Sequence, residues 1–120
     1  LVISSGFMTM RALETVEKLR ADRVDVGVLH VPTIKPFDEE TIVREAGRSG
    51  RLVIVAENHS IVGGLGEADA GVLLRAGVTP PFRQIALPDA FLDAGALPTL
   101  HDKYGISTVA MTQSIKGWLN

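Results

Sequence analysis

Two side chains that could take part in proton transfer, Glu57 and His59, stand directly after a short apolar run at residues 52–56. A carboxylate near an imidazole can orient the ring or shift its pKa, which general acid–base catalysis requires. Residues i and i+2 of an extended chain point the same way without being held in contact. The pair raises the hypothesis of a self-contained hydrolase, but two residues do not define a catalytic site.

Three glycines, Gly63, Gly64 and Gly66, follow this pair. Their spacing matches neither the dinucleotide-binding fingerprint nor a P-loop. Glycines permit a tight turn or a close backbone approach, and the helical pattern that begins here could hold an anion on free N–H groups. Turns at the carboxyl ends of strands are where α/β proteins usually meet ligands and partners. The simpler interpretation, that the glycines only turn the chain, stays open.

The sequence gives little support for a metal site, a catalytic serine or thiol chemistry. The histidines His30, His59 and His101 lie far apart, none at a metal-binding spacing, and no serine lies in a nucleophile-elbow motif. His30, in an apolar stretch, is expected to be packed and hydrogen-bonded rather than catalytic. Cysteine is absent, which excludes disulfides and thiol chemistry and is compatible with a reducing compartment. We therefore predict no catalytic residue, no metal site and a cytoplasmic location.

The amino-acid composition argues against two classes of binding partner, nucleic acids and membranes. The net charge is −2, the basic residues are scattered, and aromatic residues make up 5%, which argues against nucleic-acid binding. No apolar run approaches the roughly 20 residues of a membrane helix, and no signal peptide is seen. We expect neither nucleic acid nor membrane as a partner.

The elements that must position these residues alternate along the chain. Strands are predicted at 1–4, 25–31, 52–56 and 82–87, and helices at 7–21, after Asp38, at 64–76, at 97–104 and after Ser107. Asp38 and Ser107 are the expected N-caps. Gly71 is out of place within a helix, and a close contact with another element would explain it. The alternation predicts an α/β domain with a mostly parallel sheet that is covered on both faces.

The length of 120 residues fits a single domain, 1–120, whose hydrophobic core can be stable without disulfides or a structural metal. The chain opens directly on a predicted strand without an initiator methionine, and we expect it to be part of a longer polypeptide.

Four motifs in order resemble the C-terminal domain of the transketolase superfamily, which includes transketolases and deoxyxylulose-phosphate synthases. The motifs are the opening strand–Gly–helix (LVISSGFMTMRALETVEKL), the T-hydrophobic-K-P connection with its Asp at 30–42 (HVPTIKPFDEETI), the strand with Glu57 and the GGLG turn at 52–66, and the closing K-Y-G with a terminal helix at 101–119. The resemblance covers essentially the whole chain. It implies a three-layer α/β/α sandwich with a mixed five-stranded sheet, the fifth strand near Val78 or in the apolar loop at 91–96.

The resemblance also implies a function. Family members transfer a two-carbon ketol unit between sugar phosphates with thiamine diphosphate and a divalent metal, Mg or Ca. Both are held by a pyrimidine-binding and a diphosphate-binding domain, and neither of those domains fits in this chain. The resemblance therefore implies that this chain holds no cofactor and is inactive alone. It would pack against the pyrimidine-binding domain and support a homodimer or a split-subunit assembly.

On this interpretation the best candidate contact surface is formed by Glu57, His59, Gly63, Gly64 and Gly66. An alternative is a free-standing binding or regulatory module that holds an anion on the turn at 63–66. The hydrolase that uses Glu57 and His59 is a third hypothesis.

Overall fold

The computed structural model describes all residues 1–120, which form four strands and five helices. In chain order the elements are β1 (Val2–Ser4), α1 (Met8–Ala21), β2 (Val28–His30), α2 (Glu39–Ala46), β3 (Val53–Ser60), α3 (Leu65–Arg75), β4 (Phe82–Leu87), α4 (Leu97–Lys103) and α5 (Thr108–Leu119). Strand β4 has the predicted bounds. Strand β2 is shorter than the predicted 25–31, and β3 extends four residues beyond the predicted 52–56.

All four strands are parallel and lie in the order β2-β1-β3-β4. The chain places β2 on one side of β1, and then β3 and β4 on the other side. This change of side between β1 and β3 is the arrangement of a doubly wound fold. The expected fifth, antiparallel strand is absent. Residue Val78 lies in the loop before β4, and residues 91–96 form an exposed loop that makes no sheet hydrogen bonds.

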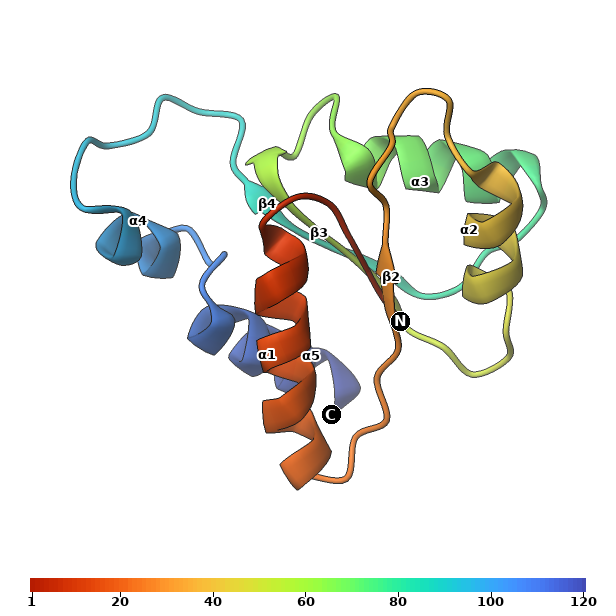
Figure 1. The fold of residues 1–120 in the computed structure, drawn as a ribbon, viewed down its shortest axis with the longest axis horizontal. Coiled ribbons are helices and arrows are strands. Elements are labelled where there is room, and N and C mark those ends of the chain that lie inside the picture. Colours follow the sequence, from red (N-terminus) through yellow and green to blue (C-terminus); the bar gives the residue numbers. More distant parts are fainter.

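The sheet is buried on both faces, as the apolar run in β3 predicts. Ile54 and Ala56 of β3 point into one core together with residues of α1 and α5, whereas Val53 and Val55 point into a second core with residues of α2 and α3. Helices α1 and α5 therefore cover one face, and α2 and α3 cover the other (Figure 1). The three-layer α/β/α architecture is confirmed.

Local signals fix several helix ends. The Asp38 carboxylate accepts a hydrogen bond from the Thr41 N–H at 3.1 Å, and the Ser107 hydroxyl accepts one from the Ala110 N–H at 3.1 Å. Both expected N-caps are thus confirmed. Gly77 follows α3 with φ +70°, the left-handed conformation that ends many helices.

The four connections that leave the carboxyl ends of the strands gather on one side of the molecule, at the top of Figure 1. Because the strands are parallel, these connections must share one edge of the sheet. We refer to this side as the carboxyl edge and to the opposite side as the amino edge. The predicted contact residues all lie at the carboxyl edge.

Candidate functional site

Glu57 and His59 lie within β3, not in a turn after it as the sequence pattern predicted. The pairing of β3 with β4 is irregular between Ala56 and Ser60. Glu57 is 2% exposed, whereas His59 is exposed and donates from Nδ1 to the carbonyl of Ser60 at 2.9 Å. No hydrogen bond joins the two side chains. The strand irregularity thus separates the pair that the i, i+2 spacing placed on one side, and the hydrolase hypothesis gains no geometric support.

The buried Glu57 carboxylate lies at the N-terminus of α3. Its Oε2 accepts a hydrogen bond from the Leu65 N–H, and the Gly66 N–H also stabilises its charge. The residue before the helix, Gly64, has no side chain that could cap it. A carboxylate from the neighbouring strand therefore satisfies backbone donors that the first turn of a helix leaves free, and it complements the positive end of the helix dipole.

The glycines of the turn have three different roles. Gly63 has φ +74°, a conformation that favours glycine, and its N–H donates to the Glu67 carboxylate at 2.8 Å. A Cβ on Gly64 would overlap the Glu57 carboxylate, and a Cβ on Gly66 would overlap the side chain of Gln84. The turn is therefore built so that side chains of the sheet can reach the helix backbone.

The expected close contact at Gly71 is wrong. A Cβ there would meet only the Arg75 Nη1 atom, at 3.2 Å, which is the far end of a flexible side chain. The close approach between α3 and the sheet occurs one and a half turns earlier, at Gly66. Both positions are glycines in a helical pattern, and only the packing distinguishes them.

Asp69, which no sequence motif singles out, is fully buried on the sheet-facing side of α3. Neither of its carboxylate oxygens has a hydrogen-bond partner, and the same is true of Oε1 of Glu57 and Nε2 of Gln84. A polar residue among Leu65, Val72 and Leu73 interrupts an otherwise apolar helix face, and this is the signal that could have revealed it.

Burial governs the protonation of both acids. Burial, together with a smaller effect of the Glu57 charge, raises the pKa of Asp69 to about 7. Burial also raises the pKa of Glu57 above its ordinary value, although the Leu65 and Gly66 N–H groups and His59 oppose this. The arrangement is a buried acid pair, in which the member that accepts N–H donors holds the charge more readily.

The carboxyl edge also exposes large apolar side chains in the connections that follow the strands. Phe7 follows β1, Ile34 follows β2, Val62 follows β3 and Phe91 follows β4, and all four are exposed. Phe91 is as exposed as an isolated residue, at 107%. Each of these side chains comes from a different connection, and the feature that they share is their position at the carboxyl edge.

Two other histidines take part in structural contacts. His30, at the end of β2, is exposed and lies 2.8 Å from the Thr9 hydroxyl, which in turn lies 2.9 Å from the Ser4 hydroxyl. His101 of α4 lies 2.7 Å from the Arg11 guanidinium of α1. No three His, Cys, Asp or Glu side chains gather in a way that could hold a metal ion, and no helix is long and apolar enough to cross a membrane.

Residues 1–111 match the family model described as "Transketolase, C-terminal domain". The chain belongs to this family. A curated, uncharacterized transketolase family protein of Sinorhizobium fredii (strain NBRC 101917 / NGR234) is 66% identical over 121 residues, which cover all of this chain and 35% of that protein. The 6-deoxy-6-sulfo-D-fructose transketolase subunit of Clostridium sp. (strain MSTE9) is 37% identical and covers 88% of this chain, which matches 32% of that subunit. The chain thus spans about a third of the length of these relatives.

Solved structures agree with the family assignment. The structure described as "Split gene transketolase, inactive beta4 tetramer" superposes with a TM-score of 0.86 at 31% identity, over 97% of this chain and 37% of the other. Transketolase from Campylobacter jejuni superposes with a TM-score of 0.64 at 16% identity, over 97% of this chain and 16% of that one, which supports the fold alone. The resemblance seen in the four sequence motifs is confirmed.

Proposed function

We propose that this transketolase C-terminal domain is a non-catalytic, organisational part of a thiamine-diphosphate-dependent, transketolase-type enzyme. Its carboxyl edge packs against the other domains of that enzyme, the pyrimidine-binding domain first, and supports a homodimer or a split-subunit assembly in the cytoplasm. The exposed apolar side chains that follow all four strands carry this proposal, because a free surface of this kind is costly in water.

The buried acids and glycines behind this edge give it a fixed shape. Glu57 accepts a hydrogen bond from the first turn of α3, and the exposed Ile61 and Val62 directly precede the Gly63–Gly66 turn. The Ile61 N–H donates to the Leu87 carbonyl at 2.8 Å, which ties this turn to the end of β4. A contact surface that is already ordered loses little conformational entropy when a partner binds.

The cofactor belongs to the proposed parent enzyme and not to this chain. Thiamine diphosphate with its Mg or Ca ion would supply the ketol-transfer chemistry between sugar phosphates from a site made by the other two domains. The residues present here do not fit such a group, because no set of metal-ligating side chains gathers and the N–H groups at the α3 N-terminus already face carboxylates. We assign no reaction step to this chain.

The test uses the complete gene product that contains this chain, together with any separately encoded subunit. Val62→Asp and Phe91→Asp each place a charge on the carboxyl edge, and both should weaken assembly and lower ketol-transfer activity without changing the circular dichroism. Leu74→Asp is the matched control, because Leu74 is equally apolar and exposed but lies near the other end of α3. Unchanged assembly by analytical ultracentrifugation in both edge variants would refute the proposal.

The alternative of a free-standing module that holds an anion on the 63–66 turn is less well supported. The Leu65 and Gly63 N–H groups already donate to Glu57 and Glu67, so an incoming anion would meet two carboxylates. A rise in melting temperature with inorganic phosphate that disappears in Gly64→Val would instead favour this alternative.

A further inference from the structure

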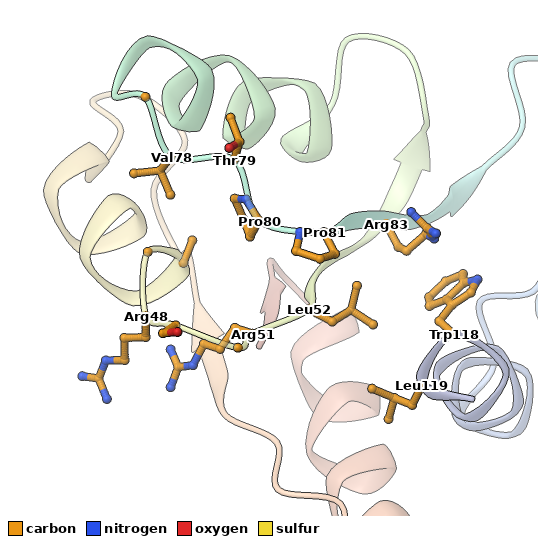
Figure 2. Close-up of a pocket in the computed structure, with 15 residues that line it drawn as sticks. Arg48, Arg51, Leu52, Val78, Thr79, Pro80, Pro81, Arg83, Trp118 and Leu119 are labelled. Atoms are coloured by element: carbon orange, nitrogen blue, oxygen red, sulfur yellow. The ribbon is translucent and has the colours of Figure 1, made fainter.

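A separate feature lies at the amino edge of the sheet, on the opposite side from the proposed contact surface. A hollow of about 610 Å³ is bounded by the loop from α2 to β3, the loop from α3 to β4, and the C-terminal turn of α5 (Figure 2). This volume is within the range of small-molecule binding sites. We refer to it as the amino-edge hollow.

The lining of the amino-edge hollow is basic. It includes Arg48, Arg51 and Arg83, and no acidic residue lines it. Outside the lining, the Glu45 carboxylate lies 2.9 Å from Arg48 and 3.2 Å from Arg51, and it also pairs with Arg44. One carboxylate thus faces three guanidinium groups. The side chains therefore leave positive charge in excess beside the C-terminal ends of α2 and α3, whose free carbonyls carry partial negative charge.

Arg83 is free of any carboxylate. Its only hydrogen bond within the chain is from Nη1 to the adjacent Phe82 carbonyl, at 2.8 Å. In Figure 2 the Arg83 side chain extends above Trp118, on the far side of the hollow from Arg48 and Arg51. The two ends of the hollow therefore both carry guanidinium groups with unused donors.

The loop from α2 to β3 also presents unused backbone donors. The N–H groups of residues 48–50 donate to no group within the chain, and neither does the Ser49 hydroxyl. Gly50 has φ +78° and open space beside its Cα. Consecutive N–H groups around a left-handed residue form a concavity that attracts anions.

The wall between the two basic ends is apolar and rigid. It consists of Leu52, Pro80 and Pro81, with Trp118 and Leu119 of α5 opposite (Figure 2). Trp118 is half-buried and presents a flat ring. From this arrangement we infer that the amino-edge hollow binds a phosphorylated small molecule, with its phosphate on the 48–51 loop and its apolar part along Leu52 and Trp118.

Because Trp118 is the single tryptophan of the chain, its fluorescence reports on the hollow directly. Phenyl phosphate is the probe. Inorganic phosphate and phenol, which each represent one half of it, are the control ligands, and all titrations are made at the same ionic strength. We expect saturable quenching by phenyl phosphate with a Kd below about 1 mM, at least about fivefold tighter than inorganic phosphate, and none by phenol. No saturation with phenyl phosphate, or equal binding of phenol, would overturn the proposal.

Variants locate the binding site. Arg48→Ala should weaken phenyl phosphate binding at least about fivefold, as the loss of a charge-assisted hydrogen bond requires. Arg83→Ala removes a charge from the opposite end of the hollow and should weaken binding less. Arg20→Ala is the control, because this exposed arginine on α1 pairs with Glu17 far from the hollow in sequence and takes no part in its lining. An equal loss of affinity in Arg20→Ala would reduce the effect to general charge and overturn the proposal. Isothermal titration of the complete gene product should give the same order of affinities.

Discussion

Glu57 performs from a strand the task that a capping side chain usually performs next to its own helix. The residue that precedes α3 is glycine, so the Leu65 N–H would be buried without a partner if this carboxylate were removed. Its burial raises the pKa of the carboxyl group, and the helix N-terminus offsets part of that cost. A residue whose type suggests catalysis is thereby explained by structure.

Replacing Glu57 tests this role. Glu57→Ala should lower the free energy of unfolding by about 2 kcal/mol, because buried backbone donors lose their acceptor. Glu57→Gln keeps an acceptor oxygen and should cost less. Urea denaturation measures both, and Glu40→Ala, an exposed change in the first turn of α2, should stay within about 0.5 kcal/mol of the parent. Equal stability of the Ala variant and the parent would contradict the capping role.

Asp69 makes stability depend on pH. Its pKa is about 7 in the folded chain, against an ordinary value of 3.8, so between these values the folded state binds more protons than the unfolded state. The contribution of Asp69 to the free energy of unfolding should therefore fall as the pH rises from about 4 to about 7 and level off above that. The difference between these two pKa values corresponds to about 4 kcal/mol over the whole pH range.

The measurement compares urea denaturation at pH 5 and pH 8. Asp69→Asn should remove the part of the decline that Asp69 causes, and Asp69→Val should make the chain more stable than the parent at pH 8 because no charge is buried. If the parent and Asp69→Asn lose the same free energy of unfolding between these pH values, the assignment to Asp69 is wrong.

At the scale of elements, α3 packs on the sheet through a glycine. Gly66 lies in the first turn of α3, where helix propensity alone favours alanine. The Gln84 side chain of β4 occupies the space that a Cβ would need. The close approach of α3 to β4 therefore depends on the absence of a side chain.

Two glycines of the same helix should respond in opposite ways. Gly66→Ala should lower the free energy of unfolding by about 1 to 3 kcal/mol, and Gln84→Ala in the same chain should relieve much of this loss. Gly71→Ala should raise it by about 0.5 to 1 kcal/mol, since Gly71 has only a flexible arginine nearby. Thermal and urea denaturation of these three variants would contradict this view of the α3 contact if Gly66→Ala and Gly71→Ala both stabilised the chain.

At the scale of the whole molecule, the two edges of the sheet differ in character. The carboxyl edge exposes apolar side chains on every connection, whereas the amino edge carries the arginines of the hollow. A partner at the first edge and an anion at the second could therefore bind together without competing for residues.

We proposed that thiamine diphosphate is held by the other domains of the parent enzyme. This chain alone should therefore not bind it. Thiamine diphosphate with Mg²⁺, each at about 1 mM, should leave the melting temperature of the chain unchanged, because a ligand stabilises only a protein that binds it. Isothermal titration should show no saturable heat. Tight, saturable binding would contradict the organisational role and require a cofactor site in this chain.

The sequence alone determined the architecture and the family. Apolar residues at the helical spacing and in short buried runs place the elements within a few residues, and Asp38 and Ser107 mark two helix starts because a cap acts within its own turn. The four motifs identify the family because their order, and not any one of them, is specific.

Tertiary structure decided what the chemically suggestive residues do. The irregular pairing of β3 with β4 buries Glu57 and exposes His59, and no local pattern shows where a neighbouring strand falls out of register. The space at Gly66, the burial of Asp69 and the gathering of arginines from the α2–β3 loop and from β4 depend on segments far apart in the chain. The expected fifth strand is absent and β2 is short for the same reason, since a strand exists only where a neighbour accepts its hydrogen bonds.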